Sequence, residues 1–151
     1  MRPFERWALH LSTALVTASG VAYAWMKYLL VADDPFAVVN HPWQGAMLAV
    51  HVLAAPALLV AFGVVFSSHI SRKLRGVKPN RRTGLAALAA FAVMTLSGYL
   101  LQVVTTPLVS KVCLVAHLVS GGVFAAAYLA HLVIGHRTGA RPRQCQMRAA
   151  A

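Results

Sequence analysis

The chain of 151 residues is long enough for one ordinary domain and too short for two. Hydrophobic residues make up 59% of it and charged residues only 11%, whereas soluble domains average roughly 45–50% and about 25%. This composition excludes an ordinary water-soluble domain and a disordered chain. The net charge of +11 does not indicate nucleic-acid binding, because the basic residues form short clusters beside apolar runs. The composition predicts an all-α integral membrane protein.

Four long apolar runs predict a bundle of four transmembrane helices. The runs cover residues 7–32, 43–68, 84–109 and 112–135. Each exceeds the roughly 20 residues that an α-helix needs to cross the hydrocarbon core. Because backbone polar groups inside a bilayer have to be satisfied within the segment, the runs are expected to be helical. Residues 1–136 are therefore predicted to form one transmembrane domain, followed by a basic tail at 137–151.

The basic residues predict the orientation of this bundle. Twelve of the 14 lie before the first run, between the second and third runs, or after the fourth run. These positions share one side of a four-span bundle, whereas the other side carries Asp33, Asp34 and Lys111, with Lys27 at its margin. The positive-inside rule places both termini in the cytoplasm. We expect a multi-pass protein of a bacterial-type inner (cytoplasmic) membrane.

Four histidines lie within the predicted spans, where titratable side chains are costly and mark function. They are His10, His51, His117 and His131. His51 and His117 lie roughly 9 and 8 Å inside the outer ends of their helices, and His10 and His131 lie about one turn inside the inner ends. No Asp, Glu or Arg lies in the spans to pair with them. That absence argues against a proton relay or an ion-coupled transporter.

Two histidine pairs at matched depths predict two b-type haems, because such a haem takes its axial imidazoles from facing helices. His51 and His117 are predicted to hold an outer haem, and His10 and His131 an inner one. The 14 residues between His117 and His131 put both on one helix face, about 21 Å apart. Small residues would let a porphyrin approach the backbone, or let helices pack closely: Ser19, Gly20, Ser97, Gly98, Gly121 and Gly122.

A weak internal repeat links the first and third runs. Residues 17–20 read TASG and residues 95–98 read TLSG, and the second and fourth runs each carry a histidine shortly after their start. The repeat predicts two related helical hairpins. Close packing of membrane helices would also explain recurring small residues.

Alternatives to this interpretation stay open. His69 follows His51 by 18 residues, or five helical turns, and is an alternative ligand of the inner haem. Pro56 lies between them and is predicted to kink the helix. Zinc or copper would favour histidines clustered at a single depth. A non-redox membrane anchor or assembly subunit of a larger complex is the main alternative function, and it would tolerate loss of the span histidines.

The helix assignment and the spacing of the histidines resemble a known family. They are similar to those of the four-helix di-haem cytochrome b subunits of membrane-bound formate dehydrogenases and nickel–iron hydrogenases, within the cytochrome b561-like group. In that family helices 1, 2 and 4 supply the ligands, and the two histidines of helix 4 are 14 residues apart. The resemblance covers residues 7–136 and supports the pairing given above. It implies electron transfer between an outer redox partner, such as an iron–sulfur protein or a c-type cytochrome, and a quinone.

The chain also departs from that family. Its connections are shorter than those of the dehydrogenase subunits, whose outer segments dock the catalytic partner. The family often carries a Lys-x-Asn-x-Gly-Gln-Lys stretch near its quinone site, and residues 78–80 match its first half whereas 81–84 do not continue it. The resemblance therefore makes Asn80 a candidate quinone ligand, with a solvated basic turn as the alternative. Substrate chemistry would belong to partner subunits or to the quinone.

Overall fold

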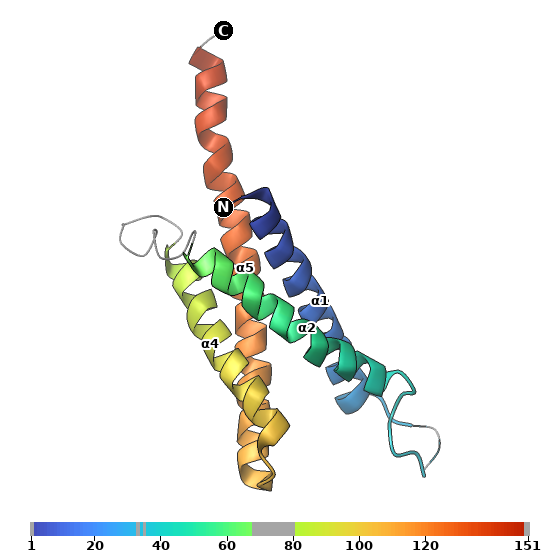
Figure 1. Ribbon diagram of the computed structural model, residues 1–151. Coiled ribbons are helices and arrows are strands. Elements are labelled where there is room, and N and C mark those ends of the chain that lie inside the picture. The colour runs from blue at the N-terminus through green and yellow to red at the C-terminus, as the bar shows by residue number, and fades with distance from the viewer. Residues whose placement is uncertain (1, 33, 35, 68–80, 150–151) are drawn as a thin grey trace. The chain divides into compact units, whose positions relative to one another are not determined.

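A computed structural model gives an all-helical chain and describes residues 2–32, 34, 36–67 and 81–149 (Figure 1). Residues 81, 136 and 138–149 are described by their backbone only. The described part contains four helices: α1 (Pro3–Tyr28), α2 (Gln44–Val65), α4 (Arg81–Val103) and α5 (Pro107–Ala149). The predicted all-α fold with four helices is confirmed.

The chain divides into two compact units, each built around one pair of packed helices. The first unit, Met1–Gly76, holds α1 and α2, and the second, Val77–Ala151, holds α4 and α5. We call them the N-terminal hairpin and the C-terminal hairpin and describe each by itself. Within each hairpin the two helices lie side by side and run antiparallel (Figure 1).

Three of the described helices are long and apolar enough to cross a membrane. The candidate spans are Gln44–Val65 in α2, Arg82–Val103 in α4 and Pro107–Gly135 in α5. They make a multi-pass membrane protein plausible. The 26 residues of α1 suffice in length, but α1 is not among the three. Polar side chains through its middle lower its hydropathy, and they include His10, Thr13 and Ser19.

The first helix begins and ends about four residues earlier than predicted, at Pro3 and Tyr28. Proline is well suited to the first turn of a helix, because that turn leaves its backbone N–H groups unpaired in any case. The Arg2 backbone N–H donates to the Glu5 carboxylate at 3.0 Å, which reinforces this start. At the other end the Asn40 amide donates to the Lys27 carbonyl oxygen at 2.9 Å and satisfies one of the terminal carbonyls.

The N-terminal hairpin packs along one face of each of its helices. Every third or fourth residue is buried, which is the period of a single helical stripe: Leu9, Thr13, Val16 and Ser19 in α1, and Ala54, Leu58, Ala61 and Val65 in α2. α2 stays helical through Pro56. Residues before and after Pro56 therefore belong to one continuous helix.

The connection within the C-terminal hairpin differs from the prediction. α4 ends at Val103 rather than residue 109, and α5 begins at Pro107 rather than residue 112, so only residues 104–106 join them. The physical reason is Pro107, which favours the first helical position and disfavours helical backbone in the residue before it. α5 also continues through the predicted basic tail as far as Ala149.

Aromatic side chains fill the middle of the C-terminal hairpin. The Phe124 side chain is 2% exposed, and its ring centroid lies 5.5 Å from that of Phe91 across the helix pair. Tyr128, one turn further along α5, stacks on the same ring at 5.7 Å. Aromatic pairs at these distances add to the packing of a helix pair. The hairpin therefore holds α4 and α5 in one fixed register, which positions the histidines of α5.

Candidate functional site

His51 lies on α2 with its ring against the backbone of α1 at Gly20. A Cβ added at Gly20 would lie 2.7 Å from Cε1 and 2.8 Å from Nδ1 of His51, well inside the 3.5–4.0 Å at which carbon atoms pack. The Nδ1 atom lies 2.9 Å from the carbonyl oxygen of Val16, one turn before Gly20. Because a carbonyl only accepts, Nδ1–H is the donor, and in the neutral ring Nε2 carries the lone pair.

His117 is held in the same way in the C-terminal hairpin. A Cβ added at Gly98 would lie 2.9 Å from Cε1 and 3.1 Å from Nδ1 of His117. Its Nδ1 lies 2.9 Å from the carbonyl oxygen of Met94, again one turn before the glycine. We call this arrangement an imidazole seat: a glycine beneath the ring, and a carbonyl four residues earlier that accepts Nδ1–H. The seat settles which ring nitrogen is the donor.

The serine before each seat glycine is part of the repeat. Ser19 Oγ donates to the Leu15 carbonyl at 2.7 Å, and Ser97 Oγ donates to the Val93 carbonyl at 2.7 Å. Both serines are buried, at 5% exposure. Each hydroxyl is therefore satisfied within its own helix and puts no unpaired polar group against the histidine. The repeat seen in residues 17–20 and 95–98 corresponds to one geometry built twice.

His131 has a related but different environment on α4. A Cβ added at Gly84 would lie 3.3 Å from Cε1 and 3.5 Å from Nδ1 of His131. Its Nδ1 lies 3.3 Å from the Thr83 hydroxyl rather than near a carbonyl. Gly84 and Gly98 are 14 residues apart, as are His117 and His131. In an antiparallel helix pair this equal spacing keeps both glycine–histidine contacts in register.

The N-terminal hairpin has one such seat, and its other span histidine comes from the opposite helix. The residue 14 positions after His51 is Val65, which is buried at 3% exposure. His10 lies instead on α1, where its half-buried ring makes a T-shaped contact with Trp7, with ring centroids 6.4 Å apart and an interplanar angle of 89°. The two hairpins thus supply the four predicted ligands from α1, α2 and α5.

Two predicted site residues, His69 and Asn80, lie outside the described residues. Each predicted haem pair takes one histidine from each hairpin, so both pairings remain predictions. His41 lies in the connection between α1 and α2, where its Nδ1 accepts the Trp43 backbone N–H at 3.1 Å. That bond stabilises the turn before α2, so His41 is not included in the candidate site, which consists of the four span histidines.

The glycines predicted to give a porphyrin or a helix close access differ in what lies beside them. At Gly20 and Gly98 the space beside the backbone is taken by an imidazole ring. At Gly121 the nearest atom is the Met94 sulfur at 3.7 Å, and Gly122 faces open space within 4 Å. Sequence reasoning also missed Thr83 and Gly84. Their distance of 14 residues from Ser97 and Gly98 was the signal that could have found them.

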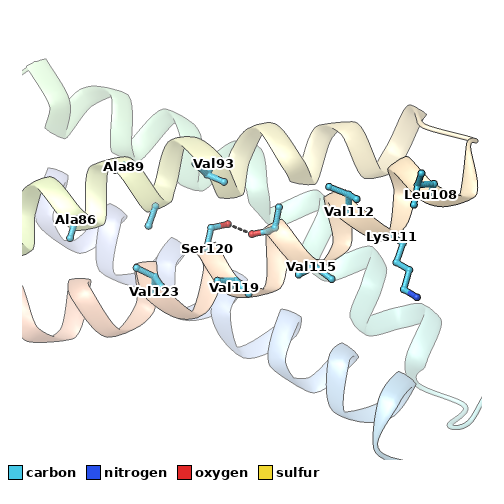
Figure 2. Close-up of a pocket in the computed structure, with 12 residues that line it drawn as sticks. Ala86, Ala89, Val93, Leu108, Lys111, Val112, Val115, Val119, Ser120 and Val123 are labelled. Atoms are coloured by element: carbon cyan, nitrogen blue, oxygen red, sulfur yellow. Dashed lines mark hydrogen bonds between the residues drawn. The ribbon is translucent and has the colours of Figure 1, made fainter.

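A groove of about 910 Å³ runs along the C-terminal hairpin, and none of the span histidines lines it (Figure 2). Alanine and valine side chains of α4 and α5 line most of it, and Lys111 lies near the start of α5. Its one serine, Ser120, donates its hydroxyl to the Ala116 carbonyl at 2.6 Å. Because most of its lining is aliphatic, the groove offers a mainly apolar surface.

Chemically, a neutral imidazole whose Nδ1–H is hydrogen-bonded presents Nε2 as a metal ligand. Ligating histidines almost always give their other N–H to a carbonyl, a carboxylate or water, which fixes the tautomer and the ring plane. His51 and His117 have this arrangement with the Val16 and Met94 carbonyls. No protein family, curated protein or solved structure was found to match this chain.

Proposed function

We propose that this protein carries electrons across a membrane through two b-type haems. His51 and His117 ligate the outer haem, and His10 and His131 ligate the inner haem. The observation that carries the proposal is the imidazole seat found once in each hairpin, at Gly20 for His51 and at Gly98 for His117. Each seat fixes the ring orientation and puts the proton on Nδ1, which is the arrangement usual for a histidine that binds a metal through Nε2.

The proposal includes a membrane topology. α1 is the fourth span, because its length is sufficient and it carries one of the ligands. Both termini and the basic segment between α2 and α4 face the cytoplasm, in keeping with the positive-inside rule. The protein then resides in a bacterial-type inner membrane.

The donor chemistry of the site fits haem. All four ligands are neutral nitrogen donors, and histidines are common axial ligands of b-type haem iron. When bound, the haem iron supplies one-electron redox chemistry by alternating between its ferrous and ferric forms. The protein's residues do the rest. The glycines admit the imidazoles to the helix backbone, and the carbonyls of Val16 and Met94 accept the Nδ1–H groups.

The spacing of the ligands sets the path of the electrons. His117 and His131 lie on one face of α5, 14 residues and therefore about 21 Å apart along the helix. In this proposal one site lies near each side of the membrane, and the separation along α5 is in keeping with that. The partners that fit are a redox subunit at the outer face, an iron–sulfur protein or a c-type cytochrome, and a quinone near the cytoplasmic face, where Asn80 is the candidate contact.

The test is the haem content of the detergent-purified full-length protein, measured by a pyridine haemochrome assay with a reduced-minus-oxidised spectrum. We expect two b-type haems per chain. A folded preparation made with ample haem supply and still free of haem would overturn the proposal. The non-redox anchor would then be the better explanation.

The inner site has its own prediction, which concerns the choice between His10 and His69. His10→Ala is expected to remove most of the inner haem, so that the haem content falls from two per chain to about one. Alanine at position 69 is expected to leave the content near two. The two variants are compared by haem content and spectrum at equal protein concentration. The opposite ranking would assign the ligand role to His69.

A further inference from the structure

The three α2 and α5 histidines do not have equivalent hydrogen-bond acceptors. His51 and His117 each place Nδ1 at 2.9 Å from a backbone carbonyl oxygen. His131 instead places Nδ1 at 3.3 Å from the hydroxyl oxygen of Thr83. The bond to the hydroxyl is longer, at the outer limit of an ordinary N–H···O bond, and therefore weaker. The proposed inner and outer sites thus differ in how strongly the protein polarises a ligand.

The contact with Thr83 does not by itself show whether Nδ1 of His131 carries the proton, whereas a contact with a carbonyl would. A hydroxyl can donate or accept, whereas a carbonyl only accepts. If His131 binds iron through Nε2, its Nδ1 has to carry the proton, and Thr83 Oγ1 has to be the acceptor. Gly84 admits the ring beside α4 at this point, with its hypothetical Cβ 3.3 Å from Cε1. Thr83 and Gly84 therefore form a second, looser type of seat.

We propose that Thr83 is a positioning residue that sets the inner haem at the higher reduction potential of the two. This inference rests on the proposed function. A strong bond from Nδ1–H makes the ligating nitrogen more basic and favours ferric iron, and a weak bond does so less. Both ligands of the outer haem have the strong bond, and one ligand of the inner haem has the weak one. Hydrogen bonding and local charge are recognised means of tuning haem potentials.

A positive charge beside the Thr83 seat acts in the same direction. Arg82, the residue directly before Thr83, is exposed. A nearby cation disfavours the more positive ferric form. With the higher potential at the inner haem, electrons move favourably from the outer haem to the inner one. The protein would then deliver electrons towards its cytoplasmic face.

The experiment is redox potentiometry of the purified full-length protein and of two variants, Thr83→Val and Thr83→Ser. Valine has nearly the shape of threonine and removes only the hydroxyl, whereas serine keeps it. We expect two haems per chain in all three proteins and two midpoints in the wild type. In Thr83→Val only the higher midpoint should rise. At a fixed ambient potential the ferrous-to-ferric ratio of that haem should increase by up to about fivefold, the change for loss of one ordinary hydrogen bond, because the bond to Thr83 is weaker than ordinary. Thr83→Ser should match the wild type.

Failure of this inference is distinguishable from failure of the proposed function. If both haems are present and Thr83→Val moves the lower midpoint, or neither midpoint, the role of Thr83 is wrong while the di-haem proposal stands. If Thr83→Val retains a single haem, it should be the one with the lower midpoint, and survival of the other would overturn the inference. A wild-type protein without haem refutes the proposed function before any variant is made.

Discussion

Replacing His117 with alanine is expected to lower the haem content from two per chain to one. His117 is the α5 ligand proposed for the outer haem, and alanine offers no donor to iron. His131, the α5 ligand proposed for the inner haem, lies 14 residues and about four helical turns after His117 along α5, so the inner haem should be retained. The pyridine haemochrome assay gives the number, and potentiometry shows which midpoint has disappeared.

The pairing is tested by making the same change at the partner residue. His51→Ala should remove the same haem as His117→Ala, so the two variants should retain the same single midpoint. His41→Ala is the matched control, because His41 serves a turn before α2 and should leave both haems in place. If either span variant retains both haems, or if the two variants lose different haems, the outer pairing is wrong.

A second large effect is expected from adding one methyl group at Gly98. In Gly98→Ala the new Cβ would lie 2.9 Å from Cε1 of His117, so the ring has to move away from α4. Moving the ring breaks the 2.9 Å bond to the Met94 carbonyl. Loss of such a supporting bond typically weakens metal affinity by about 10–100-fold. The outer haem should therefore be depleted, as measured by haem content after extended detergent washing.

The Gly98→Ala substitution should disturb the contact with His117 without destabilising the helix. Alanine is a better helix former than glycine by about 1 kcal/mol, so the substitution does not weaken α4 as a helix. Gly122→Ala is the matched control, because a Cβ there meets nothing within 4 Å. It should retain both haems. Equal haem loss in the two variants would show that the effect is not specific to the seat.

Gly20 offers an independent check from the other hairpin. In Gly20→Ala the new Cβ would lie 2.7 Å from Cε1 of His51. Since His51 and His117 are proposed to ligate the same iron, Gly20→Ala and Gly98→Ala should deplete the same haem. Gly63→Ala in α2 is the matched control, with open space around the added atom. Depletion of two different haems would refute the pairing of His51 with His117, but it would not contradict the description of either seat.

Several features of this protein follow from the order of its residues. Apolar runs of membrane length predict helices because a bilayer leaves backbone groups no other partner, and the all-α fold with four helices is confirmed. The helical repeat places His117 and His131 on one face of one helix. The ends of the helices were less predictable, because Pro3 and Pro107 shift them by several residues relative to the hydropathy. Polar residues in α1 likewise keep it out of the three candidate spans.

The sequence by itself determined that the chain forms four helices and how its histidines are spaced along them, because these features depend on neighbours within one helix. Only the tertiary structure decided what each histidine contacts. The residue types at positions 16 and 94 do not identify the carbonyls of Val16 and Met94 as acceptors, since every residue has a backbone carbonyl. They accept an imidazole N–H only where a glycine one turn later on the same helix lets a ring from the neighbouring helix approach. The Thr83 hydroxyl beside His131 comes from a residue 48 positions away, and the packing register of α4 against α5 brings the two together.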